Sequence, residues 1–393
     1  MSKSVTAKIQ PTLLVWARET AGYSIDAAAK KIHVSAEKLV ACESGEQSLT
    51  FKQLQEAANV YKRPLALFFL PDAPALEARV QDFRLDSDVA DQPLSPAVNI
   101  EIRRARQHRD EAMELARELE SDIPSFLVTA TMQERPDAVA QRLTELLKLD
   151  DQKVASWKNQ DEALKGRKAA AEAVGVLIFE ASRIPTEQMR GVALPFDQLP
   201  VVILNGADSA AGRSFTLMHE LTHLLLRQGG VCDLAPTEDS SPNARIEQFC
   251  NAVAAAVLMP TSKVLALVPN SAPEAWTMDQ LGALAKPFRV SREALLVRLV
   301  NLGRATHQHY LTMRPLFREE YLAFRQSQKS ESDGGPSPAV MAVRNLGKPF
   351  IHLVLDAYAN ERIGLSTVSD YLGVKLKHLP KIRGMVLGNG VAA

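Results

Sequence analysis

One apolar helical segment, SFTLMHELTHLLLRQ at residues 214–228, constrains the fold more than any other part of this sequence. It carries His219, Glu220 and His223, and residues four apart share one face of a helix, so the two imidazoles point the same way. Its other positions are mostly large apolar residues that favour burial: Phe215, Leu217, Met218, Leu221, Leu224, Leu225 and Leu226. Burying three ionisable side chains is costly unless they are paired or coordinated. The sequence therefore predicts a core built around this helix.

Two histidines at this spacing can bind one metal ion, and Glu220 lies beside the first of them. Zn²⁺ suits such a site because it lowers the pKa of a water molecule toward neutrality, and Glu220 can then accept a proton from that water. The alternative is a solvated pair of histidines on a surface helix, which the apolar flanks argue against. A hydrolytic zinc site needs three protein ligands, so one more must come from elsewhere in the chain.

The third ligand is expected to be Glu247, in the segment NARIEQFCNAVAAAVLMP at residues 243–260. Apart from Glu247, Gln248 and Asn251, the helix predicted there is almost wholly apolar. Glu247 and Asn251 are four apart, so the carboxylate can bind metal while the amide orients a ligand histidine. The open alternative is a surface glutamate that is favoured near a helix start by the helix dipole.

The whole chain has the composition of a cytoplasmic globular protein. It has 393 residues, enough for two or three domains, with 46 Lys and Arg against 46 Asp and Glu. The positive and negative charges therefore balance, and the chain as a whole does not attract nucleic acid or a membrane surface electrostatically. The chain has no apolar run of about 18 residues and no apolar secretory signal at its start. Three scattered cysteines do not make a disulfide framework.

The coarse pattern predicts an α+β protein with an all-helical N-terminal domain. Residues 1–72 resemble a helix-turn-helix domain, in which Ser35 begins the second helix of the motif. Residues 73–135 combine a linker rich in Pro and Asp with a charged amphipathic helix. Residues 136–303 hold the two histidine and glutamate helices, strands at 176–179 and 201–205, a further strand within 189–195, and a helical pair at 277–303. Residues 304–393 form a helical region with a flexible linker near 327–339.

The motifs FTLMHELTHLLL, GGVCD and EQFCNAVAAAVLMP resemble the ImmA/IrrE family of metallopeptidases. YKRPLALFFLPDAP, DFR, MRGVALP and GVKLKHLPKI are similar to the members that carry an XRE-type helix-turn-helix domain before the peptidase. The resemblance implies a zincin-like domain with zinc on His219, His223 and Glu247, and with Glu220 as the catalytic base. It also implies a regulatory endopeptidase that cleaves a specific partner, such as a DNA-binding repressor or an antitoxin-like protein.

A second function remains open, in which the chain is a DNA-binding antitoxin or transcriptional regulator and its peptidase domain serves as a sensor or binding module. Ser35 and Lys38 are the candidate DNA contacts on the second helix of the motif. The DNA-binding signal is weak, because residues 1–70 carry nine Lys and Arg against six Asp and Glu. A helical platform for partner proteins or for a homodimer is the alternative.

Three further features have both a functional and a plain structural interpretation, and a fourth has a functional one only. Cys232 either blocks the metal as a thiolate ligand or is simple apolar packing. His307 and His309 either donate to an oxyanion or lie in a polar loop. The basic residues at 103–109 either contact phosphate or form a solvated face. The strand at 201–205 could hold an extended peptide by main-chain pairing.

Overall fold

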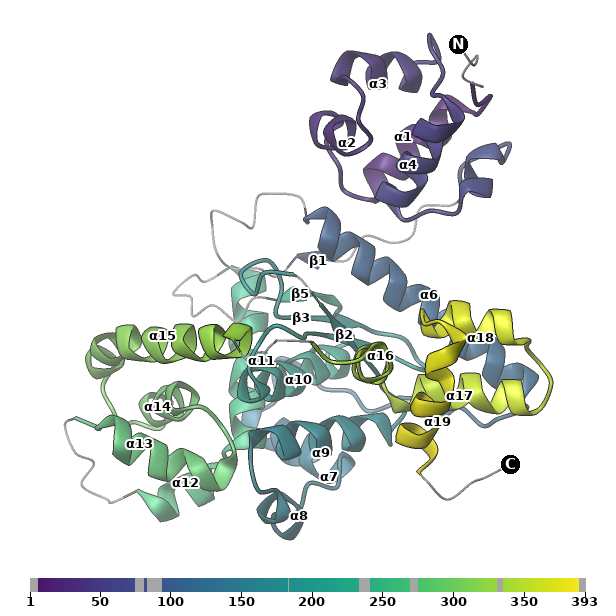
Figure 1. The fold of residues 1–393 in the computed structure, drawn as a ribbon. Coiled ribbons are helices and arrows are strands. Elements are labelled where there is room, and N and C mark those ends of the chain that lie inside the picture. Colours follow the sequence, from purple (N-terminus) through teal and green to yellow (C-terminus); the bar gives the residue numbers. More distant parts are fainter. Residues whose placement is uncertain are drawn as a thin grey trace. The chain divides into compact units, whose positions relative to one another are not determined.

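The computed structural model describes residues 6–74, 81–82, 94–182, 184–232, 241–268, 275–330 and 335–388. The chain divides into two compact units, which Figure 1 shows as ribbons coloured along the sequence. One comprises Met1–Val80 with Ser87–Arg104, and the other comprises Gln81–Asp86 with Ala105–Ala393. The second unit combines a sheet with many helices, so the expected α+β class is confirmed.

The described part of the first unit is helical apart from an isolated β-bridge between Thr6 and Thr50, and three of its helices begin at side-chain caps. It contains α1 (Pro11–Thr20), α2 (Ile25–Lys31), α3 (Ala36–Glu43), α4 (Phe51–Tyr61) and the 3₁₀ helix η1 (Leu65–Phe69). The hydroxyls of Ser24, Ser35 and Thr50 accept the first free backbone amides of α2, α3 and α4. His33, with φ of 58°, makes the tight turn between α2 and α3. The two short helices and the tight turn expected here are therefore present, and their assignment as a helix-turn-helix domain stays a prediction.

A five-stranded sheet forms the centre of the second unit, in the order β1-β5-β3-β4-β2. Its strands are β1 (Gln81–Asp82), β2 (Leu177–Ala181), β3 (Gly191–Leu194), β4 (Val201–Asn205) and β5 (Gly230–Cys232). β3 runs antiparallel to both β4 and β5, whereas β2 is parallel to β4 and β1 is parallel to β5. Because β4 lies between β3 and β2, the expectation that this strand pairs with a substrate is wrong.

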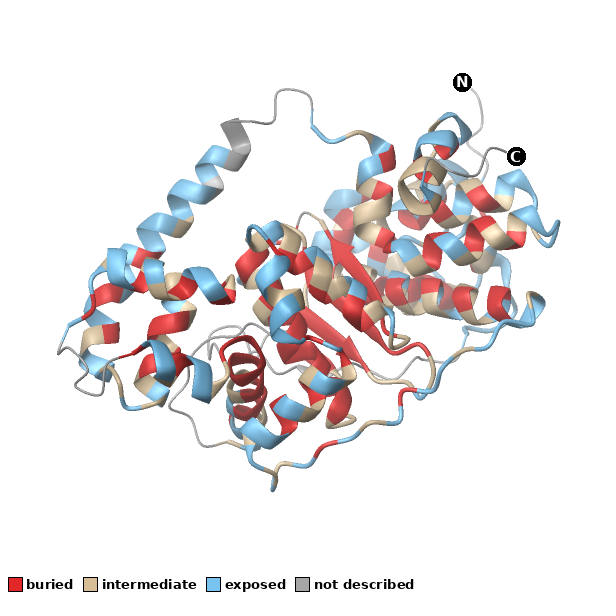
Figure 2. Ribbon diagram, turned by 90° about the horizontal axis from the view of Figure 1, so that it is seen from below, coloured by how far each residue is buried: buried red, intermediate tan, exposed pale blue. Residues whose placement is uncertain are grey.

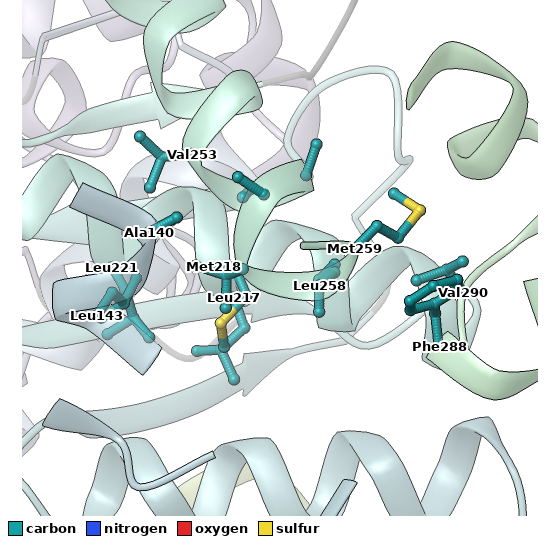
Figure 3. Close-up of a cluster of buried hydrophobic side chains, with 14 of the residues drawn as sticks. Ala140, Leu143, Leu217, Met218, Leu221, Val253, Leu258, Met259, Phe288 and Val290 are labelled. Atoms are coloured by element: carbon teal, nitrogen blue, oxygen red, sulfur yellow. The ribbon is translucent and has the colours of Figure 1, made fainter. Parts of the chain in front are cut away.

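Two long helices cover the middle of the sheet. α10 (Ala210–Leu225) packs against α11 (Pro242–Leu258), α9 (Gln160–Glu172), β3 and β4, and α11 also packs against α7 (Pro136–Leu146). Every residue of β2, β3 and β4 is buried, and Figure 2 shows these strands as a nearly continuous buried layer. Figure 3 shows Leu217, Met218 and Leu221 of α10 beside Ala140, Leu143 and Val253.

The remaining helices are the amphipathic helix α6 (Pro96–Glu118), the short helix α8 (Asp151–Ser156), which precedes α9, and two groups that follow the central sheet in the chain. One group comprises α12 (Thr261–Leu267), α13 (Met278–Ala285), η2 (Lys286–Phe288), α14 (Arg292–Asn301) and α15 (His307–Ser330). The other comprises α16 (Pro338–Leu346), α17 (Lys348–Ala359), α18 (Leu365–Leu372), η3 (Leu376–His378) and α19 (Leu379–Leu387). The C-terminal group packs on the sheet through α16 and β2.

α15 corrects two expectations about the C-terminal half. His307 and His309 lie in the first turn of this helix, so the prediction of a polar loop is wrong. The helix also continues to Ser330, so the segment expected as a flexible linker near 327–339 is helical over its first residues. α16 begins at Pro338, and residues 331–334 lie outside the described part of the chain.

Within the described residues, no single helix is long and apolar enough to cross a membrane. The pair α11 and α12 reaches that length and apolarity only when its two helices are taken together, and they are bent by 59°. Most of α11 is buried in the protein core, which accounts for its apolar composition.

Candidate metal centre

Helix α10 carries the two histidines and the glutamate, and it is buried and capped at its N-terminus. The Ser209 hydroxyl accepts the Gly212 amide at 3.0 Å, which begins the helix four residues before the segment expected from the sequence. His219, Glu220 and His223 are each 0% exposed. Their burial confirms that the apolar flanks enclose this helix, and it excludes the alternative of a solvated pair of histidines.

Glu247 comes from the second turn of α11 and meets both histidines. Its carboxylate oxygens lie 3.2 Å from His219 Nε2 and 2.9 Å from His223 Nε2. The two Nε2 atoms are themselves 3.1 Å apart. Ligand atoms of a tetrahedral zinc ion, each about 2.0–2.1 Å from the metal, lie roughly 3.4 Å from one another. The three side chains therefore converge as a ligand set, with all their donor atoms within 4.8 Å of one another.

Asn251 sets which nitrogen of His219 faces this cluster. Its Oδ1 lies 2.9 Å from His219 Nδ1, and an amide oxygen can only accept, so Nδ1 donates the proton. In the neutral ring the lone pair then sits on Nε2, on the side of Glu247. A single proton can satisfy only one of the three short contacts among these side chains, whereas one divalent metal ion satisfies all three. The donor set therefore fits a metal.

The charges of the cluster agree with a cation-binding role. Burial disfavours the ionised form of Glu247, but the two imidazoles outweigh it and hold the pKa of this carboxyl at about 2. Burial lowers the pKa of His223. Burial also acts to lower the pKa of His219, yet Glu247 reverses this effect and the net shift is upward. Glu247 is therefore an anion facing two nitrogen donors.

Glu220 lies beside the ligand set and is not part of it. Consecutive residues are about 100° apart around a helix, so Glu220 is about 100° from His219 and about 60° from His223, at the edge of the face that holds the two histidines. Its carboxylate is packed over Gly191 of β3, where an added Cβ would lie 2.3 Å from Glu220 Oε1. Any larger residue at 191 would displace the carboxylate. Gly191 is a site residue that the sequence reasoning missed, and its only local signal is a glycine at the start of a strand.

The two candidate DNA contacts are in the first unit and both have partners there. Ser35 Oγ accepts the backbone amide of Lys38 at 3.2 Å as the cap of α3. Lys38 Nζ donates to Gln53 Oε1 at 3.1 Å, and that oxygen also accepts the Thr50 amide. Ser35 therefore caps α3, and Lys38 connects α3 to α4.

His309 has a partner away from the candidate metal centre. Its Nε2 lies 2.9 Å from the backbone nitrogen of Trp276, just before α13 (Met278–Ala285). The backbone of Cys232 pairs with that of Gly191, but its side chain lies outside the described part of the structure.

The basic residues at 103–109 are largely structural, so the expected solvated face is only partly correct. Arg103 donates to the Tyr61 carbonyl at 2.7 Å, and Arg109 donates to the Gln198 carbonyl at 3.0 Å. His108 is buried against Phe179 and Phe350.

No curated protein matches this chain. Residues 171–300 match the Peptidase M78 family model, described as the IrrE N-terminal-like domain. The matched residues contain α10, α11 and strands β2 to β5, and with them His219, Glu220, His223 and Glu247. The resemblance to the ImmA/IrrE peptidases is thereby confirmed for this part of the chain, and the helix-turn-helix unit lies outside the match. Residues 171–300 are similar to an IrrE-like peptidase domain, and the buried cluster of two histidines and a glutamate is its candidate metal centre.

Proposed function

We propose that this protein is a zinc-dependent endopeptidase that regulates gene expression or a stress response by cleaving a specific partner protein. The observation that carries the proposal is the buried convergence of His219, His223 and Glu247 next to the carboxylate of Glu220. The match to a peptidase family model over the same residues supports it.

In this proposal the chain's own residues divide two tasks. His219, His223 and Glu247 hold the zinc ion, which supplies Lewis acidity to a substrate carbonyl and to a water molecule. Glu220 accepts a proton from the attacking water and delivers it to the amine that leaves as the peptide bond breaks. Asn251 keeps His219 in the tautomer that presents Nε2. The burial of the three ligands and Glu220 excludes bulk water and strengthens the electrostatic interactions among them.

The test compares the wild type with Glu220→Gln and His219→Ala. Glu220→Gln keeps the three ligands and the helix but loses a base whose help is typically worth about 10²–10⁴-fold. We expect it to retain zinc, measured by elemental analysis, and to lose cleavage of the partner protein in cells. His219→Ala is expected to lose both zinc and cleavage.

A second function is carried by the helix-turn-helix geometry of α2 and α3, namely a DNA-binding antitoxin or regulator whose peptidase domain acts as a sensor. The same comparison separates the two proposals. If Glu220→Gln supports the full regulatory phenotype with an uncleaved partner, the protein acts by binding and the endopeptidase proposal is refuted.

A further inference from the structure

A buried hydroxyl next to Glu220 has no partner among the described residues. Thr216 lies in α10 and is 1% exposed, and its Oγ1 makes no hydrogen bond within the described structure. Buried hydroxyls are nearly always satisfied, and a threonine in a helix can usually donate to the carbonyl four residues earlier. Thr222 in the same helix does this, donating to the Met218 carbonyl at 2.9 Å. The hydroxyl of Thr216 is therefore available for another acceptor.

The proposed base lies on the same helix face as Thr216. Thr216 and Glu220 are four residues apart, which places them on one face of α10. Both side chains meet the same point over β3, where a Cβ added to Gly191 would lie 2.3 Å from Glu220 Oε1 and 2.5 Å from Thr216 Cγ2. A rotation of about 120° about χ1 can carry Oγ1 to the position that Cγ2 now holds, while Cγ2 moves to the third staggered position, and threonine populates two χ1 rotamers in helices. That rotation brings Oγ1 to the side of the Glu220 carboxylate.

We propose that Thr216 is a positioning residue that donates a hydrogen bond to the Glu220 carboxylate when the metal site is loaded. A hydroxyl bonded to a carboxylate makes one of the stronger protein hydrogen bonds, and here it would form in a site from which water is excluded. The bond holds Glu220 in one rotamer and favours its ionised form, as a base requires. This inference rests on the proposed function, because it assigns a role toward the same carboxylate.

The experiment measures the melting temperature of the full chain with and without added Zn²⁺, for wild type, Thr216→Val, Thr216→Ser and Thr222→Val. Thr216→Val keeps the shape and removes the hydroxyl. Without zinc we expect this variant to melt no lower than the wild type and up to ~2–4 °C higher, because an unsatisfied buried hydroxyl is lost. With zinc we expect the upward shift to be smaller than in the wild type by a similar amount. Thr216→Ser restores the wild-type shift.

Thr222→Val is the matched control, because its hydroxyl is equally buried but is already bonded within the helix. It is expected to lower the melting temperature equally in both forms and to leave the zinc-induced shift unchanged. A Glu220→Gln background provides a double-mutant cycle, in which Thr216→Val should reduce the shift less than it does with Glu220 present. Activity on a cleaved partner should fall roughly 10–100-fold in Thr216→Val, mainly in kcat, as for other residues that orient a site.

Either of two results would overturn the inference about Thr216 and leave the proposed function standing. One is a wild type and a Thr216→Val variant with the same zinc-induced shift. The other is a Thr216→Val variant that is less stable than the wild type without zinc, since the hydroxyl would then have a structural partner already. A wild type that binds no zinc refutes the proposed function, and the role of Thr216 falls with it.

Discussion

Asn251 and Glu247 occupy one face of α11, and in the proposed zinc site they have different roles. Glu247 contributes the charge, whereas Asn251 contributes only orientation, through its contact of 2.9 Å with His219 Nδ1. Loss of the charge should therefore abolish binding, and loss of the orientation should weaken it.

Substitution of these two residues tests those roles. Glu247→Ala is expected to lower zinc content to a small fraction of one ion per chain, because two imidazoles alone do not hold a hydrolytic zinc. Asn251→Ala is expected to keep a full ion at saturation but to raise its dissociation constant about tenfold. Elemental analysis and competition with a chelator measure the two effects, and circular dichroism controls for the helices. A full zinc ion in Glu247→Ala would contradict the ligand assignment.

At the scale of elements, a buried carboxylate on β2 connects the sheet to three helices. Glu180 binds Lys168 of α9 at 2.9 Å, Arg213 of α10 at 2.8 Å and Arg344 of α16 at 2.8 Å. Arg344 also donates to the Gly206 carbonyl, so α16 is fixed to the strand ends. The helix that carries the metal histidines and the first helix of the C-terminal group thus share one anion.

This cluster predicts how stability depends on pH. Burial alone would raise the pKa of Glu180, but Lys168 and the two arginines hold it at about 2, below the ordinary value of 4.5. A lowered pKa stabilises the fold above pH 4.5, and that contribution, on the order of 3 kcal/mol, is lost as the pH falls from 4.5 toward 2.

Glu180→Gln should lower the melting temperature at pH 7 and flatten its fall between about pH 4.5 and 2. Burial raises the pKa of the neighbouring Glu172, which gives a change of opposite sign in both proteins, so the difference between wild type and variant is the quantity to measure. Melting curves at several pH values provide it. Parallel curves for the two proteins would show that the pKa of Glu180 is the same in the folded and unfolded states, which would contradict this prediction.

At the scale of the whole molecule, the first unit contains the segment predicted as a helix-turn-helix, and the described surface of its helix α3 is poorly suited to reading DNA. Val40 on the outer side of α3 is 50% exposed, Glu37 is exposed beside it, and Lys38 is bonded to Gln53. We therefore expect the protein to bind its own promoter no more than about tenfold more tightly than random duplex, with a shallow dependence on salt.

Filter binding or anisotropy over a salt series measures this preference, and Lys38→Ala should change the affinity little. A preference of about a thousandfold or more, reduced by Lys38→Ala, would instead establish direct reading of DNA.

The sequence predicted those parts of the structure that depend on residues close together in one helix or strand. The ligand histidines are four residues apart on one helix, and the caps at Ser24 and Ser35 act within three residues, so each had a local pattern. β5 and β1 are short and have no such pattern. The roles of Gly191 and Glu180 depend on side chains that come from other elements, which no spacing along the chain specifies.

The start of α10 has a consequence for how the length of this chain can vary. Ser209 fixes the beginning of the helix, and each further residue turns it by about 100° and advances it by about 1.5 Å. Thr216, His219 and His223 therefore take their directions from their number of residues after that serine. One residue inserted or deleted between 209 and 223 would turn at least one histidine away from Glu247, whereas the loop before Ser209 is free of this constraint. Natural variants of this sequence that keep the metal centre should therefore have insertions and deletions only outside residues 209–223.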